Sequence, residues 1–156
     1  MIVRDEFLID QASGAIYEHG WQSWSPSTAY RLGDQPWRST SERTRILCYR
    51  PERSPSADVF WGEGLLAIDP GDETGIRIYA VREAIETVPS IKAEARGNQM
   101  VVSSDGAIDC LTDRGPGGIE GALARWAEGF ALRAGVTSLR RAPTIWCSWY
   151  QYFNDV

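Results

Sequence analysis

Two short aromatic segments hold the side chains of this sequence that are best suited to a chemical role. Gly20–Ser25 reads Gly-Trp-Gln-Ser-Trp-Ser, and Trp146–Phe153 reads Trp-Cys-Ser-Trp-Tyr-Gln-Tyr-Phe. The chain has seven tryptophans in 156 residues. An excess of this large, rarely fully buried residue often marks a surface on which a flat partner stacks. The face of a sugar ring, a protein partner and a plain core are all open as partners of these rings.

Other residues that could carry catalysis have simpler interpretations. His19 is the only histidine, which excludes a metal site with two histidine ligands, and no serine lies in a nucleophile-elbow pattern. Asp69–Asp72 is typical of a hairpin turn, and Asp109 and Asp113 flank a strand end. Gly115–Gly118 lacks the Lys-Ser/Thr that a phosphate-binding loop requires. We therefore predict no metal and no cofactor in this chain.

In this order, the segments Gly20–Ser25 and Trp146–Phe153 resemble the melibiase-type α-galactosidases, glycoside hydrolase family 36. The resemblance covers nearly the whole chain, although only these two motifs are specific. It implies an antiparallel β-supersandwich, one linking helix and the first strand of a truncated (β/α)₈ barrel, which carries the Trp-Cys-Ser-Trp-Tyr run. The chain departs from the family at Ile145, where members usually have glycine, and in the short stretch before Gly20.

The resemblance also implies where a sugar is contacted. Active sites of (β/α)₈ barrels lie at the C-terminal ends of the strands. The family pattern gives Trp149 an apolar face for a galactose ring and Tyr150 a hydroxyl for hydrogen bonding, while Trp24 matches a tryptophan that the sandwich adds to the same pocket. We therefore expect Trp24, Trp149 and Tyr150 to bind substrate. The simpler interpretation is that all three rings fill a core or an interface.

The implied activity is hydrolysis of terminal α-galactosides with retention, through a covalent glycosyl-aspartate. Both catalytic aspartates of the family lie on later barrel strands. We therefore expect an N-terminal fragment of a retaining α-galactosidase, inactive alone, whose partners are an α-galactoside sugar and the remainder of its own barrel. The alternative is a non-catalytic carbohydrate-binding or interaction module, and a transglycosylating relative is a weaker possibility. Homo-oligomerisation of the parent enzyme stays open.

The pattern of short apolar runs separated by turn residues predicts a mainly β fold. Alternation is clear in Ile76–Val81 and Ile91–Arg96, and turns are indicated at Asp69–Asp72 and Arg96–Asn98. Ser25–Ser41 is rich in Pro, Ser, Thr and Gly and predicts a long loop. The expected strands are Val3–Ile9, Ile16–Ser25, Arg45–Arg50, Ala57–Gly62, Leu65–Ile68, Ile76–Glu83, Ala84–Val88, Ile91–Arg96, Gln99–Ser103 and Ala107–Leu111.

A change of period after these strands predicts a helix and a domain joint. Within Gly118–Gly135, apolar residues recur at helical spacing, and Gly135 is a natural stop. The helical face consists of Ile119, Leu123, Trp126, Phe130 and Ala134. We expect the sandwich at residues 1–115, the linking helix and linker at 116–141, and the start of the catalytic barrel at 142–156.

Composition limits which partners and which cellular compartment are expected. The net charge of −5 and the single lysine argue against nucleic-acid binding, which requires clustered Lys and Arg. The N-terminus carries Arg4, Asp5 and Glu6 where a signal peptide would be apolar, and no stretch is long enough to span a membrane. Three widely spaced cysteines fit reduced thiols better than a disulfide framework. A cytoplasmic location is therefore expected.

Overall fold

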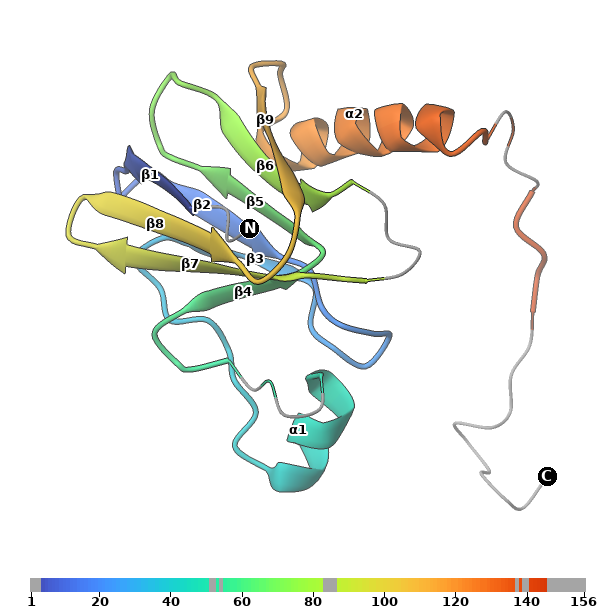
Figure 1. Ribbon diagram of the computed structural model, residues 1–156, viewed down its shortest axis with the longest axis horizontal. Helices are drawn as coiled ribbons and strands as arrows, with labels where there is room; N and C mark the ends of the chain where they lie inside the picture. The colour runs from blue at the N-terminus through green and yellow to red at the C-terminus, as the bar shows by residue number, and fades with distance from the viewer. Residues whose placement is uncertain are drawn as a thin grey trace. The chain divides into compact units, whose positions relative to one another are not determined.

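Two antiparallel β-sheets make up most of the fold, and the computed structural model describes residues 4–50, 53, 55–82, 87–136, 138 and 141–145 (Figure 1). The four-stranded sheet has the order β1 (Arg4–Leu8), β8 (Gln99–Ser104), β7 (Ser90–Arg96) and β4 (Phe60–Glu63). The five-stranded sheet has the order β3 (Thr28–Arg31), β2 (Ala15–Glu18), β5 (Leu65–Asp69), β6 (Ile76–Val81) and β9 (Ile108–Asp113). The mainly β prediction is confirmed.

The chain divides into two units, residues 1–126 and 127–156, and both sheets belong to the first. Two helices complete the described elements, α1 (Glu42–Cys48) and α2 (Gly118–Arg133). No helix in the described part of the chain is long and apolar enough to cross a membrane. The expected division at residues 115 and 141 stays a prediction.

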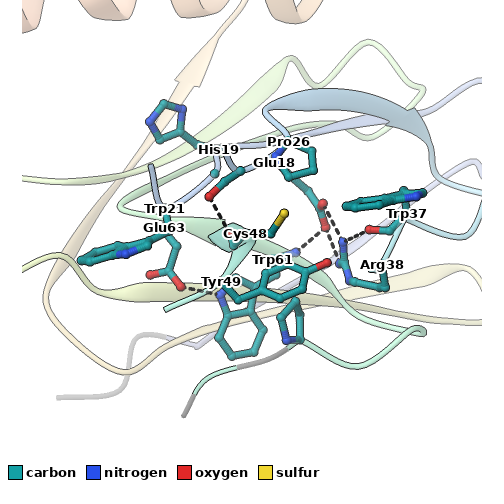
Figure 2. Close-up of a pocket in the computed structure, with 13 residues that line it drawn as sticks. Glu18, His19, Trp21, Pro26, Trp37, Arg38, Cys48, Tyr49, Trp61 and Glu63 are labelled. Carbon is teal, nitrogen blue, oxygen red and sulfur yellow. Dashed lines mark hydrogen bonds and ion pairs between the residues drawn. The ribbon is translucent and has the colours of Figure 1, made fainter. Parts of the chain in front are cut away.

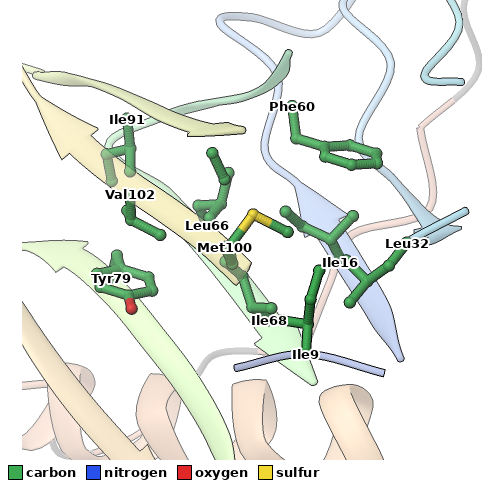
Figure 3. Packing of buried hydrophobic residues seen from close by; sticks show 11 residues of the cluster. Ile9, Ile16, Leu32, Phe60, Leu66, Ile68, Tyr79, Ile91, Met100 and Val102 are labelled. Carbon is green, nitrogen blue, oxygen red and sulfur yellow. The ribbon is translucent and has the colours of Figure 1, made fainter. Parts of the chain in front are cut away.

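The main core lies between the two sheets. Alternating side chains of facing strands meet there, as a two-layer β fold requires, because each sheet must bury one apolar face (Figure 3). Ile16, Leu66 and Ile68 of the five-stranded sheet pack in one cluster with Ile91 and Met100 of the four-stranded sheet. All five side chains are fully buried. This cluster fixes the register of the strands, since a one-residue slip would take each of these side chains out of the core between the sheets.

A second cluster covers the opposite face of the five-stranded sheet. Leu65 and Ala67 of β5 pack there with Ile76, Ile78 and Ala80 of β6. The first half of α2 closes this cluster with the fully buried Ala122 and with Ile119, Leu123 and Trp126. The expected helix is thus confirmed, together with the first three residues of its apolar face. The central strands of this sheet are buried on both sides.

Three of the expected elements are wrong, and each error has a local cause. Arg45–Arg50 was expected as a strand, but α1 covers most of it because Ser41 caps a helix by accepting from the N–H of Thr44. The expected strand Ile16–Ser25 ends at Glu18, and the aromatic motif forms bends and a turn. The expected loop Ser25–Ser41 contains β3, which pairs with β2. Ala84–Val88 lies mostly outside the described residues.

The two sheets are joined at a corner where β4 passes into β5. Gly64 makes this turn with a φ of +73°, a left-handed conformation that glycine adopts without steric cost. The Glu63 N–H donates to the carbonyl of His19 at 2.9 Å, so the free edge of β4 is paired with the residue that follows β2. The corner therefore brings the end of β2 beside β4, and this is where the first aromatic motif begins.

The packing of the core predicts that alanine substitutions at two leucines differ strongly in their effect on the free energy of unfolding. Leu66→Ala should lower the free energy of unfolding by about 2–5 kcal/mol, because the side chain is fully buried between the sheets and leaves a cavity. Leu132→Ala, the same change at a side chain that is 76% exposed, should alter it by less than about 0.5 kcal/mol. Urea denaturation measures both, and similar values for the two variants would contradict this packing.

Candidate functional site

The first aromatic motif, Gly20–Ser25, is held against α1 by backbone carbonyls at the end of the helix. The Ser25 hydroxyl donates to the carbonyl of Cys48 at 2.6 Å, and the Cys48 thiol donates to the carbonyl of Trp24 at 3.4 Å. The Gln22 side-chain amide donates to the carbonyl of Leu47. These contacts satisfy carbonyls that have no partner within the helix. They also fix the backbone on both sides of Trp24.

Glycine is required at the start of this motif because the chain folds back on itself. The Ser25 N–H donates to the carbonyl of Gln22 at 2.8 Å and closes a tight turn. A Cβ atom at Gly20 would lie 2.4 Å from the Cβ of Ser25 and 2.7 Å from the carbonyl oxygen of Pro26. Any side chain at residue 20 would therefore push the turn apart.

Three tryptophans at this end of the fold remain partly exposed. Trp24 is 51% exposed, Trp37 is 49% exposed and Trp21 is 38% exposed. The guanidinium of Arg50 lies 4.4 Å from the centroid of the Trp21 ring and covers one of its faces. Trp24 is thus a half-exposed side chain on a turn whose backbone is held by α1. Trp149 and Tyr150, the other two expected sugar contacts, lie outside the described residues, as do Trp146 and Cys147.

A buried ion pair between Glu18 and Arg38 lies beside Trp37 (Figure 2). The guanidinium donates to both oxygens of Glu18, at 2.7 and 3.0 Å. Its remaining donors reach the backbone carbonyls of Trp37, Ser56 and Val59 at 2.9, 3.3 and 2.6 Å. All five N–H donors of the arginine are thus satisfied. Such complete pairing is what a buried charge requires to be tolerated.

A third donor to Glu18 comes from the edge of β4. The backbone N–H of Trp61 lies 2.6 Å from one of its oxygens. The Trp61 indole N–H then donates to Glu63 at 2.8 Å (Figure 2), and the Ser90 hydroxyl donates to the other oxygen of Glu63 at 3.0 Å. Arg50 approaches the same oxygen at 3.7 Å. Two buried carboxylates therefore lie on either side of Trp61, and both are well supplied with donors.

The cavity among these residues is small. It encloses about 20 Å³ between the Glu18–Arg38 pair, Trp21, Trp37 and Trp61. A space of this size holds about one water molecule and cannot admit a hexose. Any sugar that this end of the fold binds must therefore rest on the exposed faces of the rings.

The two buried carboxylates do not form a catalytic pair. Glycoside hydrolysis requires one carboxyl group to donate a proton and another to attack or activate water. Here both oxygens of Glu18 and of Glu63 accept hydrogen bonds from protein donors, so neither is open to a substrate. No cluster of potential metal ligands occurs in the described part of the chain. The arrangement is suited to holding a surface in shape.

Two titratable rings border the site. The hydroxyl of Tyr17 lies 3.0 Å from Nδ1 of His19, and partial desolvation lowers the pKa of His19 below its ordinary value. Burial, and then the nearby charge of Glu18, raise the pKa of Tyr30. The Tyr30 hydroxyl accepts from the N–H of Trp37 at 3.3 Å. The structural role expected for His19 stays a prediction.

The sequence analysis overlooked Glu18, Arg38 and Glu63. One signal for Glu18 was available: Ile16 and Glu18 alternate in β2, so a buried Ile16 turns Glu18 toward the same side of the strand. Nothing comparable marked Arg38, because it lies in an irregular segment and its partner is twenty positions away. Long-range charge pairing of this kind has no local pattern.

Comparisons of the chain with protein-family models, with curated proteins and with solved structures find no match in any of the three. The resemblance to α-galactosidases therefore depends on the two aromatic motifs, and the function that it implies is argued below as a proposal.

The buried Glu18–Arg38 ion pair predicts that replacing Arg38 strongly destabilises the fold. Arg38→Met should lower the free energy of unfolding by about 3–5 kcal/mol, because it leaves the Glu18 carboxylate buried without its cation. The matched change Arg96→Met removes an exposed pair with Glu94 and should cost at most about 1 kcal/mol. Adding Glu18→Gln to Arg38→Met should recover part of the loss. Denaturant unfolding of the three variants measures this, and equal losses at Arg38 and Arg96 would contradict the assignment.

Proposed function

We propose that this chain is the N-terminal β-sandwich region of a melibiase-type α-galactosidase and that Trp24 offers an aromatic face to a terminal α-galactosyl unit. The single observation that carries the proposal is the state of Trp24: the backbone around it is fixed by α1, while its side chain stays half exposed. An exposed ring on a fixed backbone is suited to sugar binding, because the turn that carries it need not be ordered on binding.

Further support comes from the order of the elements and from the motifs. Two antiparallel sheets precede a helix, and the second aromatic motif follows that helix in the sequence. In this family the glycosidic bond is expected to be hydrolysed with retention of configuration by two aspartates of the barrel. Their carboxyl groups are expected to lie about 5–5.5 Å apart. In this proposal Trp24, Trp149 and Tyr150 bind the sugar, and the chain contributes no acid, base or nucleophile.

A free-standing carbohydrate-binding module is the second candidate. The partly exposed Trp21 and Trp37 favour it, because indole faces that border one cavity can bind a sugar without any catalytic domain. The two candidate functions predict different affinities of the chain for a monosaccharide. A ring that supplies only part of a pocket should bind a monosaccharide with a Kd on the order of millimolar, whereas a complete binding module should reach the micromolar range.

The test is a titration of the chain with methyl α-galactoside, followed by the indole N–H resonances in ¹H–¹⁵N spectra. The Trp24 resonance, identified by its loss in Trp24→Phe, should shift, and methyl α-glucoside, the C4 epimer, should shift it less. Trp24→Ala should weaken binding about tenfold, which corresponds to about 1.4 kcal/mol. Trp37→Ala removes an equally exposed indole and should change the Kd less than about twofold.

The outcomes separate the candidates. Binding on the order of millimolar with a Trp24 shift supports the proposal, and a micromolar Kd favours the binding module. An unmoved Trp24 resonance contradicts the proposal. Incubation with an aryl α-galactoside should release no product above buffer, and measurable turnover would contradict the assignment of catalysis to other residues.

A further inference from the structure

An open groove lies on the outer face of the four-stranded sheet, away from the core. Trp61 of β4 and Lys92 of β7 are direct partners in the strand pairing, and they face outward because their neighbours Phe60 and Ala93 face the core. The groove has a volume of about 490 Å³, and Arg53, Glu94 and Asp105 also line it. This volume lies within the range of about 300–1,000 Å³ that small-molecule sites occupy.

Trp61 forms a fixed aromatic wall in this groove. Its backbone N–H is bound by Glu18 and its indole N–H is bound by Glu63, so both ends of the residue are anchored by buried carboxylates. An aromatic ring that is already ordered loses little freedom when a ligand stacks on it. Trp61 therefore offers a platform of the kind on which the C–H face of a pyranose ring packs.

Lys92 is the cation in this groove that has no carboxylate partner among the described residues. Glu94 is paired with Arg96 at 2.7 Å, and Asp105 is paired with Arg53. The Lys92 ammonium instead lies 4.7 Å from the centroid of the Trp61 ring. A cation–π contact at an exposed position is weak, so the ammonium can turn to an anionic ligand at little cost. Its three N–H donors are then available.

We propose that this groove is a second sugar site, which takes a pyranose with a carboxylate, such as a hexuronate. The sugar ring stacks on Trp61 and the carboxylate pairs with Lys92. The carboxylates of Glu94 and Asp105 do not oppose this, because each has its own arginine. Trp61 also borders the small cavity beside Trp21 and Trp37, but this site does not use Trp24, so it does not depend on the function proposed above.

The test compares two ligands that differ only at C6: methyl α-D-galactopyranosiduronate, which carries a carboxylate, and methyl α-D-galactopyranoside, which carries a hydroxymethyl group. The Trp61 indole resonance, identified in Trp61→Phe, should shift with the uronoside, which should bind about fivefold more tightly than the neutral sugar, as one exposed ion pair allows. Raising the salt concentration from about 20 mM to about 0.5 M should reduce this preference. Because Lys92 is the only lysine, a ¹³C-methyl label on its amine gives a direct second readout.

Variants at Lys92 provide the controls. Lys92→Met should abolish the preference for the uronoside, and Lys92→Arg should retain it. Arg43→Met removes one positive charge at an exposed position on α1 and should leave the preference unchanged. A Trp61 resonance that the uronoside does not move, or equal affinities for the two ligands in wild type and Lys92→Met, would overturn the proposal. A shift at Trp24 with none at Trp61 would do so as well, while leaving the galactoside proposal intact.

Discussion

The buried carboxylate of Glu18 is the constraint on which this end of the fold depends. It accepts from the Arg38 guanidinium and from the backbone N–H of Trp61, so one side chain joins β2, the segment after β3 and the edge of β4. The His19 carbonyl joins the same elements, because it accepts from the backbone N–H of Glu63 on the same edge of β4. A buried charge that loses its partner costs several kcal/mol, so these segments must assemble together.

This constraint explains why the aromatic surface has a defined shape although its rings are exposed. The corner fixes where β2 ends, and the turn that follows is held by the carbonyls at the end of α1. Trp61 is anchored from two sides by carboxylates that belong to the same network. The polar groups therefore hold the backbone of both Trp24 and Trp61 in place.

Strong local periodicity accounts for what the sequence predicted well. The alternation in β6 and β7 and the helical spacing in α2 each reflect one face that is buried in a core. α1 was missed because its apolar residues Ile46 and Leu47 are exposed, so no amphipathic pattern marks it. The aromatic motif was expected to be extended because aromatic residues favour strands, but its turn is set by contacts with Leu47 and Cys48, more than twenty positions away. Trp24 was expected as a sugar contact from its motif, and this stays a prediction, whereas the Glu18–Arg38 ion pair has no local signature.

Amide hydrogen exchange at Trp61 tests the central claim most directly. This N–H lies on the edge of β4 that no strand covers, and the Glu18 carboxylate is its acceptor. If the carboxylate holds the corner, the Trp61 amide should exchange within about tenfold of the amides in the ladder between β7 and β8. Exchange of the Trp61 amide at the rate of an open edge or a loop, while the ladder stays protected, would contradict the account.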